Sequence, residues 1–441
     1  MKIVIAHPGQ QHSYQLAAAI KRQGCLYRYI TTFYAFQKKG TLLRKIPLFK
    51  SFTSRMLNRR CKELDDTDIE TFGELGFLVV AFLLRCDKKG NLYRKVNCWL
   101  SHWFGRKVAR YAIKNHVDAV VMYDTNAATC FSVLKKRAPQ IIRIQDVSAI
   151  NRLYMKNIYE EDMKRSPQSA KHLMSERGFL FEKRYQEEWQ KEINLSNYFI
   201  VPSEIVSKSL IFSGARREHI FKCPYGTNFE VIRRKHITKK TIEVLYIGNI
   251  TQMKGISYLL EAISRLPDEK FHLTMVGKFD ESWELLKKYK NKVHFVGYVM
   301  HEKLQSYLEM ADVFVFPSLG DSFGLVVLEA LSYGLPVICT DHAGAADAIT
   351  NGENGFVVPA GSAEAIEEKL VYCYEHPDFL LAAREKAYDT AEKYTWARYQ
   401  NDIGEVIEYL CRERKKDDET NICGSYTIQF DSSYRVGTKR R

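Results

Sequence analysis

Two carboxylates, Asp321 and Glu329, stand eight residues apart, the first in a loop and the second in a predicted helix. An apolar strand over 313–316 precedes the loop, and Phe323-Gly324 opens the helix, which places Glu329 in its second turn. A helix N-terminus presents unpaired amides and a partial positive charge, which suit a diphosphate. A carboxylate such as Glu329 can accept two hydrogen bonds from the diol of a ribose. Taken alone, the spacing equally describes a solvated loop aspartate and a glutamate on a helix surface.

A lysine follows another predicted strand. The strand ending at Gly248 is followed by Asn249, then by Lys254-Gly255 and a helical pattern over 256–266. A cation in this loop could stabilise a departing diphosphate, whose charge develops only in the transition state. The alternative is an ordinary solvated surface lysine.

Further short segments continue this pattern through the C-terminal half. They are VPS at 201–203, PYGTN at 224–228, VG at 276–277 and at 296–297, YGLPVI at 333–338, Gly344, NGENGF at 351–356 and YTW at 394–396. In this order, and together with the carboxylate pair and Lys254-Gly255, they resemble the retaining GT-B glycosyltransferases, in particular glycosyltransferase family 4. The resemblance covers residues 195–400.

This resemblance implies an α/β fold of two doubly wound, Rossmann-like domains that face a cleft, with a C-terminal helix crossing back to the N-terminal domain. It implies a retaining transfer from a nucleotide-diphosphate sugar, with Lys254 on the diphosphate, Asp321 on the sugar hydroxyls and Glu329 on the ribose. The retaining mechanism thought to operate in the family needs no protein nucleophile, because the leaving diphosphate takes the proton of the acceptor. The donor-binding residues that the resemblance implies are Gly9, Gly248, Asn249, Lys254, Gly277, Phe323, Gly324, Leu325 and Glu329.

Three positions depart from the family pattern. Asp321 stands where the family has Glu, one methylene longer, which bears on the sugar contact. Asn249 stands where the family usually has Arg, so one phosphate charge is missing. Gly9 is a single glycine in HPGQQHS, where the family has a pair.

The N-terminal half offers fewer assignments. Some relatives place a His at the end of a later strand, but Gln145 occupies that position here. His7, Asp124 and Asp146 follow predicted strands and are candidates for the cleft, because ligands of parallel α/β sheets bind at the carboxyl ends of the strands. Each is equally explained as ordinary loop polarity.

The elements predicted to position these residues alternate between apolar strands and helices, as in parallel sheets covered by helices. We expect an N-terminal acceptor domain over 1–200 with basic helical insertions and a nucleotide-sugar domain over 201–395. The crossing helix is expected over 396–414, and a mobile tail over 415–441, where the periodicity is lost.

Charge is distributed unevenly over the 441 residues, whose formal net charge is +14. Residues 1–200 carry 35 Lys and Arg against 18 Asp and Glu, and the remainder carries 31 against 34. The segment Lys38–Lys62 interleaves cations with apolar residues, which is typical of a helix lying on an anionic membrane. A solvated cationic helix pair over the acceptor cleft is the alternative. Nucleic acid is not an expected partner, because no nucleic-acid-binding motif accompanies the cations.

No cofactor or metal is expected. Asp66-Thr67-Asp68 spells the D-x-D of metal-dependent GT-A glycosyltransferases, but it follows no clear strand. The ten cysteines include no CxxC pair and are predicted to be reduced and mostly buried thiols. The expected location is cytoplasmic, possibly peripheral on the inner face of the cytoplasmic membrane, because no apolar run is long enough to span a bilayer.

The predicted function is transfer of a sugar to a glycan or lipid-linked acceptor in cell-surface polysaccharide assembly. A GT-B-fold nucleotide-sugar epimerase is one alternative. A non-catalytic relative that binds a nucleotide sugar or a membrane is the other. Base, sugar, acceptor and oligomeric state are not given by the sequence.

Overall fold

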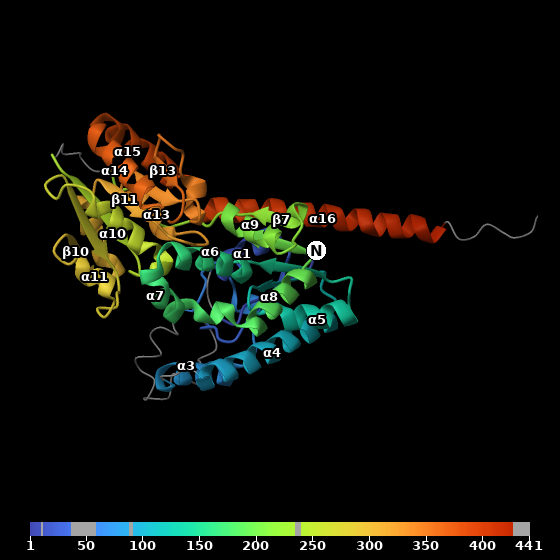
Figure 1. The fold of residues 1–441 in the computed structure, drawn as a ribbon. Helices are drawn as coiled ribbons and strands as arrows, with labels where there is room; N and C mark the ends of the chain where they lie inside the picture. The colour runs from blue at the N-terminus through green and yellow to red at the C-terminus, as the bar shows by residue number, and fades with distance from the viewer. Residues whose placement is uncertain (10–11, 37–58, 88–90, 234–239, 427–441) are drawn as a thin grey trace, which may run out of the picture.

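The computed structural model describes residues 1–9, 12–36, 59–87, 91–233 and 240–426. Two parallel sheets covered by helices form two α/β domains, and the long helix α16 runs from the second domain along the first (Figure 1). This confirms the predicted fold class.

The N-terminal sheet contains seven strands within the described residues, in the order β3-β2-β1-β4-β5-β6-β7, and all of them pair in parallel. The strands are β1 (Ile3–Ala6), β2 (Leu26–Thr31), β3 (Ile69–Thr71), β4 (Ala119–Tyr123), β5 (Ile142–Asp146), β6 (Tyr198–Val201) and β7 (Ile220–Lys222). The helices are α1 (Ser13–Arg22), α3 (Glu74–Cys86), α4 (Asn91–Lys114), α5 (Ala127–Arg137), α6 (Arg152–Arg165), α7 (Pro167–Arg177), α8 (Lys183–Leu195) and α9 (Glu204–Phe212).

The C-terminal sheet has six strands in its described part, in the order β10-β9-β8-β11-β12-β13, again all parallel. The strands are β8 (Ile242–Ile247), β9 (Phe271–Val276), β10 (Val293–Gly297), β11 (Val313–Phe316), β12 (Val337–Thr340) and β13 (Gly355–Val358). The helices are α10 (Ile256–Ser264), α11 (Glu284–Lys288), α12 (Gln305–Met310), α13 (Leu325–Ser332), α14 (Ala363–Glu375), α15 (Pro377–Ala391) and α16 (Trp396–Tyr426).

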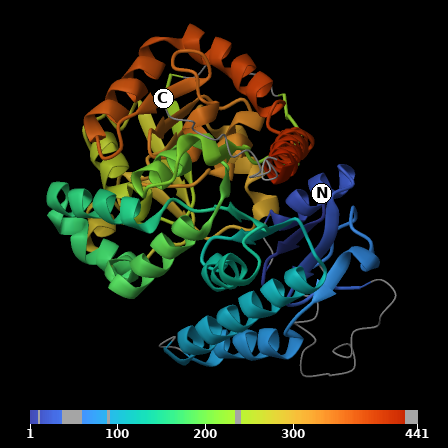
Figure 2. The same cartoon turned by 90° about the vertical axis from the view of Figure 1, so that its right-hand side faces the viewer.

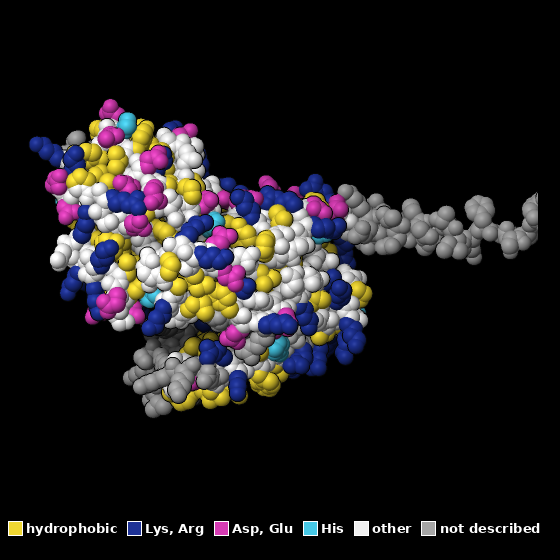
Figure 3. Space-filling model, in the orientation of Figure 1, with side chains coloured by type: hydrophobic (Ala, Val, Ile, Leu, Met, Phe, Trp, Pro, Cys, Tyr) yellow, Lys and Arg dark blue, Asp and Glu magenta, His cyan; other side chains and the backbone are white. Residues whose placement is uncertain are grey.

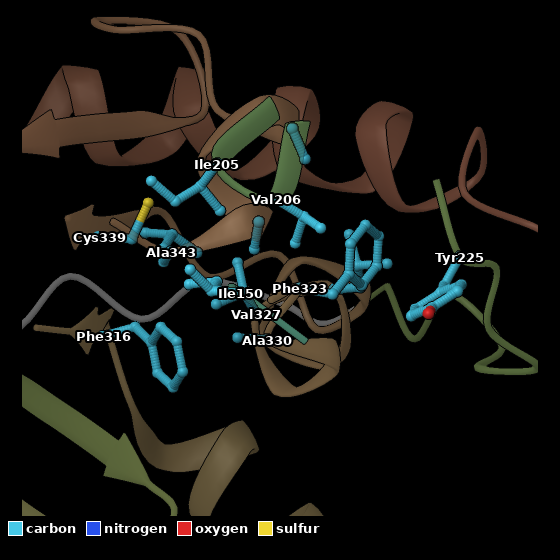
Figure 4. Close-up of a cluster of buried hydrophobic side chains, with 14 of the residues drawn as sticks. Ile150, Ile205, Val206, Tyr225, Phe316, Phe323, Val327, Ala330, Cys339 and Ala343 are labelled. Carbon is cyan, nitrogen blue, oxygen red and sulfur yellow. The ribbon is translucent and has the colours of Figure 1, made fainter. Parts of the chain in front are cut away.

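The central strands are apolar on both faces because helices cover both sides of each sheet. β1, β4 and β11 are buried along their whole length. The main apolar core is continuous between the domains. Figure 4 shows Ile150 and Val206 of the first domain close to Phe323 and Val327 of the second.

The N-terminal sheet extends past the boundary predicted at residue 200. β6 continues through α9 into β7, and β7 pairs with β6 in parallel, so residues up to 222 belong to this sheet. The 201–203 segment nevertheless contacts the other domain, because the Ser203 hydroxyl donates a hydrogen bond of 2.6 Å to the carbonyl oxygen of Ser322. Segment 201–203 therefore belongs to the first sheet and also lies at the border between the domains.

Two connecting segments lie side by side between the domains. The Thr227 amide donates to the Tyr394 carbonyl oxygen at 2.9 Å, and Thr227 bridges Thr395. α16 then begins at Trp396, as predicted, and runs along α1, where the Gln400 amide donates to Gln15 Oε1 at 2.8 Å (Figure 2).

The tail predicted from residue 415 begins as a helix. α16 continues to Tyr426, since the residues from 415 to 423 contain neither Pro nor Gly and can extend a helix. Residues 427–441 lie outside the described residues. Within the part of the chain that the structure describes, no helix combines the length and apolarity that crossing a bilayer requires.

Two other predictions concern the basic segment and the cysteines. Most of the basic segment Lys38–Lys62, from 38 to 58, lies outside the described residues. The nine cysteines whose side chains the structure describes, all except Cys423, are free thiols, and six of these nine are buried, as expected for reduced structural thiols.

Candidate active site

A cavity of about 290 Å³ opens between the two domains. Its N-terminal wall comes from the residues after β4, from the β5–α6 connection and from α6 and α8, and its C-terminal wall comes from the loops before α10 and α13. The residues lining it are Asp124, Thr125, Ala149, Ile150, Arg152, Met155, Tyr159, Leu180, Trp189, Met253, Lys254, Gly320, Asp321 and Ser322. The carboxyl ends of the parallel strands meet here, as expected for a ligand site in this kind of sheet.

Lys254 and Asp321 form an ion pair in this cavity. Lys254 Nζ contacts Asp321 Oδ2, and Asp321 Oδ1 accepts a hydrogen bond of 3.1 Å from the Phe323 amide. Lys254 closes the short 3-10 helix η6 (Gln252–Lys254), and its ammonium lies 5.3 Å from the centre of the Phe316 ring. The structure therefore brings together two of the predicted catalytic residues that lie 67 positions apart in the chain.

Glycine fixes the backbone on both sides of this pair. Gly255 adopts a left-handed conformation with φ +69°, and a Cβ at this position would overlap the carbonyl oxygen of Pro317. Gly324 has φ +82° and caps the N-terminus of α13, with Leu325 as the first helical residue. Only glycine adopts this conformation without strain, so the sequence fixes both turns.

Glu329 lies in α13 and is buried. Burial raises the pKa of its carboxyl, and the opposite charge of His301 lowers it. His301 Nε2 lies 3.1 Å from Glu329 Oε1. Glu329 does not line the interdomain cavity, so the structure does not place it beside Lys254 and Asp321.

The remaining predicted donor-binding residues divide between exposed and buried positions. Asn249 is exposed, and its carbonyl oxygen accepts a hydrogen bond of 2.7 Å from the Tyr246 hydroxyl. Gly277 packs directly against the carbonyl group of Gly248. The Phe323 ring is buried 5.2 Å from the Tyr225 ring, so its side chain supports the domain junction rather than lining the cavity.

The predicted candidates of the first domain also occupy defined places. The Gly9 amide donates to His7 Nδ1 at 2.8 Å, and the His7 ring packs edge-on against Tyr123. Asp124 lines the cavity and accepts hydrogen bonds from the amide and the hydroxyl of Ser148 at 3.0 and 2.8 Å. Burial raises the pKa of the Asp124 carboxyl, and the bonds from Ser148 lower it.

Asp146 pairs with a histidine that the sequence analysis did not select. His12 Nε2 lies 2.9 Å from Asp146 Oδ2, both side chains are buried, and the His12 ring packs 4.3 Å from the Tyr225 ring. Through His12, Asp146 therefore connects the turn between β1 and α1 to Tyr225 at the domain junction. His12 lies in the same HPGQQHS loop as Gly9, and this proximity was the available signal.

Gln145 points to a buried glutamate. Its amide donates to Glu192 Oε2 at 2.9 Å, and Glu192 also accepts hydrogen bonds from the amides of Thr125, Ala127 and Ala128 at 2.9, 2.8 and 3.2 Å. Burial raises the pKa of Glu192 to about 8, against the lowering effect of these amides. Glu192 thus fixes the loop that carries Asp124.

Arg152 and Trp189 form the outer part of the first-domain wall. The Arg152 guanidinium lies 3.6 Å from the centre of the Trp189 ring, a cation–π geometry. Neither these residues nor Glu192 were selected from the sequence, because they lie in a highly charged helical segment. The available signal was the spacing of Trp189, Glu192 and Ile193, which puts a carboxylate on the apolar face of α8.

The D-x-D candidate has a structural role. Asp65 and Asp68 both bind Lys21 Nζ, at 2.6 and 2.7 Å, and they cap the 3-10 helix Asp66–Asp68. Across the described ranges, no three His, Cys, Asp or Glu side chains are grouped so that they could hold a metal ion.

The fold is that of the GT-B glycosyltransferases. The structure of Anabaena HepE in complex with UDP aligns with 93% of this chain and 100% of its own, with a TM-score of 0.56 and 16% identity. The lipopolysaccharide outer core galactosyltransferase WaaB aligns over 93% of this chain and 100% of its own, with a TM-score of 0.59 and 13% identity. At these identities the two structures show the shared fold alone.

The family follows from the sequence of the second domain. Residues 228–393, within the C-terminal domain, match the family described as glycosyl transferases group 1. O-antigen chain mannosyltransferase B of Escherichia coli is 29% identical over 161 residues, which is 34% of this chain and 42% of the relative. The amylovoran biosynthesis glycosyltransferase AmsK of Erwinia amylovora is 28% identical over 234 residues, which is 48% of this chain and 57% of the relative. The chain thus spans about half the length of the curated relatives that it matches.

Proposed function

We propose that this protein transfers a sugar from a nucleotide-diphosphate donor to a hydroxyl of a glycan or lipid-linked acceptor, with retention of the anomeric configuration. The observation that carries the proposal is the Lys254–Asp321 ion pair in a cavity whose opposite wall belongs to the other domain. The named activities of the relatives support a role in polysaccharide or lipopolysaccharide assembly.

In this proposal the C-terminal domain holds the donor. Lys254 binds the diphosphate and stabilises the charge that develops as it leaves. Asp321 accepts hydrogen bonds from the sugar, and Glu329 accepts them from the ribose. The backbone at Gly324 and Leu325 presents a helix N-terminus to the phosphates. Because Lys254 supplies the cation, we expect transfer to proceed without a metal.

The acceptor binds on the first-domain wall, between Asp124 and the Arg152–Trp189 pair. The two carboxylates that line the cavity are both paired, Asp124 with Ser148 and Asp321 with Lys254, and the proposal assigns the role of nucleophile to neither. The leaving diphosphate oxygen then accepts the proton of the attacking hydroxyl. Positioning and charge stabilisation supply the catalysis.

The expected location is cytoplasmic, at the inner face of the membrane where lipid-linked acceptors are presented. The basic segment Lys38–Lys62 supports this by its composition, since juxtaposed cations and apolar residues bind anionic lipid.

The proposed function is tested by thermal unfolding with UDP-, GDP-, ADP- and dTDP-sugars in EDTA. Ligand at about 100 times its dissociation constant stabilises the native state by about 2.7 kcal/mol. We expect one nucleotide to raise the midpoint of the wild type and of Glu353→Ala, a surface control, but not of Glu329→Ala. The active donor is then incubated with acceptor extracts, and transfer is measured.

Each outcome has a consequence. Transfer with retention supports the proposal. Donor binding followed by epimerisation without transfer would assign the epimerase alternative. Binding without any turnover in the presence of acceptor extracts would favour the non-catalytic alternative, and no stabilisation by any donor would contradict the proposed donor site.

A further inference from the structure

Helix α3 presents an apolar face to solvent. Leu75, Val79 and Phe82 recur at the spacing of one helix face, and Leu75 and Phe82 are 80% and 61% exposed. A single exposed apolar residue needs no explanation, but a continuous stripe marks an interaction surface.

The stripe cannot turn inward, because the opposite face of α3 is fixed on α4. A Cβ at Gly73 would lie 2.9 Å from the Trp103 ring, and one at Gly76 would lie 2.7 Å from Leu100 Cδ2, so these glycines permit close packing. At the other end of the hairpin the Tyr93 amide donates to Asp87 Oδ2 at 2.9 Å. α3 and α4 thus form an antiparallel pair below the N-terminal sheet (Figure 2).

Helix α4 continues the surface with positive charge. Leu92 and Trp99 are exposed, Trp99 to 61%. The exposed cation Lys95 lies three residues after Leu92, and the exposed cation Arg106 lies seven residues after Trp99. Residues 91–114 contain six Lys and Arg and no Asp or Glu. Figure 3 shows apolar side chains at the lower edge of the molecule, over α3 and α4, with Lys and Arg among them.

We propose that the α3–α4 pair is a docking surface for an anionic phospholipid bilayer. In this arrangement the stripe of α3 and the indole of Trp99 enter the boundary between headgroups and acyl chains, and the α4 cations contact lipid phosphates. The complementary charge favours this occupant over a second copy of the chain, because a symmetric contact would oppose the same cations.

A small, mostly apolar groove lies beside this surface. It has a volume of about 80 Å³, and its walls include Phe77, Val80 and Leu100 of the two helices. Pro8 and Asn126, on the loops after β1 and β4, also line it. Docking through α3 and α4 therefore sets the carboxyl edge of the N-terminal sheet beside the membrane. The docking surface is distinct from Lys38–Lys62 and does not depend on the proposed enzymatic activity.

The test is co-sedimentation of the full-length protein with vesicles of phosphatidylcholine, alone or with about a third phosphatidylglycerol. We expect binding to the anionic vesicles and at least a tenfold loss for the triple variant Leu75→Ser/Val79→Ser/Phe82→Ser, about the effect of removing three apolar anchors. Met310→Ser/Leu381→Ser, which changes exposed apolar residues of the other domain, should bind like the wild type.

The charge contribution is measured with two matched pairs. Lys95→Gln/Arg106→Gln should weaken binding to anionic vesicles about tenfold, whereas Lys135→Gln/Arg137→Gln on α5 removes the same charge from the same domain with little effect. Tryptophan fluorescence gives a second readout, because a blue shift on vesicle addition should disappear in Trp99→Phe.

Three results would overturn the proposal: a wild type that does not bind anionic vesicles, a triple variant that binds as well as the wild type, or equal losses in test and control variants. A concentration-dependent dimer that the triple variant abolishes, without vesicle binding, would assign the surface to a second copy instead. The midpoint of thermal unfolding without ligand, measured on the same variants, verifies folding and keeps this result separate from the proposed function.

Discussion

In the proposed function, the Lys254 ammonium exchanges one partner for another. It is paired with Asp321, whose other oxygen accepts a hydrogen bond from the Phe323 amide. This pairing neutralises a partly buried cation and keeps it at the cavity wall, so binding of the proposed diphosphate would require little reorganisation. Preorganised charge of this kind contributes most to the transition state.

Replacing Lys254 should therefore reduce kcat more than donor affinity. We expect Lys254→Ala to lower kcat about 10²–10³-fold, the usual effect of removing one group that stabilises developing charge. Initial rates of transfer and donor titrations measure the two quantities. Lys287→Ala, an exposed lysine paired with Glu284 in the same domain, is the control. Equal loss of kcat in both variants, or a loss confined to KM, would contradict this role.

Glu192 gives the folded state a dependence on pH. Its pKa is raised by burial to about 8, from an ordinary value of 4.5 in the unfolded chain. Between these values the native state retains a proton that the unfolded state has lost, so this group's contribution to stability is full below about pH 4.5 and is lost as the pH rises through about 8. Urea unfolding at several pH values should show this decrease in the wild type.

The comparison for Glu192 is Glu192→Gln, which cannot titrate. Its free energy of unfolding should lack the decrease between about pH 5 and pH 8, although it will be lower than that of the wild type at low pH because one amide group faces backbone donors. Parallel pH profiles for the two proteins would show that Glu192 does not titrate in this range.

At the scale of elements, the turn into α10 depends on one glycine. Gly255 and Gly352 have similar positive φ angles, +69° and +78°, but only a Cβ at 255 would meet a neighbour, the Pro317 carbonyl. We expect Gly352→Ala to cost about 1–2 kcal/mol through backbone strain alone. Gly255→Ala should cost at least twice as much, because Pro317 must also move.

Denaturant unfolding measures both costs, and donor titration shows whether the displaced turn carries Lys254 with it. Reduced donor binding is expected in Gly255→Ala and unchanged binding in Gly352→Ala. Similar stabilities of the two variants would show that the contact with Pro317 relaxes freely.

The local elements were predictable from the sequence because their signals are local. The apolar strand over 313–316, the glycine turn at 324 and the start of the crossing helix at 396 lie where the pattern put them. The partners of buried polar groups were not predictable, since the pair of His12 and Asp146 joins residues 134 positions apart. The exposed stripe of α3 was also missed, because an apolar run in a sequence predicts a buried segment, and only its packing shows which side chains remain exposed.

At the scale of the whole molecule, α6 connects the first-domain wall of the cavity to the loop that carries Lys254. Asp162 of α6 is buried, and it accepts hydrogen bonds from Gln252 Nε2 at 3.0 Å and from the Tyr258 hydroxyl at 2.6 Å, both in the other domain. Gln252 opens the 3-10 helix that Lys254 closes. A second contact, stacking of His172 on Trp283 at 4.0 Å, lies on α7. Domain position and the place of Lys254 are thus mechanically linked.

This link predicts that Asp162→Ala impairs transfer from a distance. The substitution leaves two buried donors unpaired, at about 1–3 kcal/mol each, which opens the contact between the domains. Even a small displacement of the Lys254 side chain from its present position should lower kcat/KM by about tenfold or more. Donor affinity should change less, because Glu329 and the α13 N-terminus lie wholly in the second domain.

The measurements are transfer kinetics, donor titration and the radius of gyration by small-angle scattering. Glu161→Ala, a neighbouring exposed position on α6, is the control, and Asp162→Asn, which keeps one acceptor oxygen, should recover part of the rate. The expected result is a larger radius of gyration and reduced kcat/KM for Asp162→Ala alone. If Asp162→Ala and Glu161→Ala had the same radius of gyration and the same kcat/KM, the apolar core between the domains would hold them in place. Lys254 would then be positioned by its own domain.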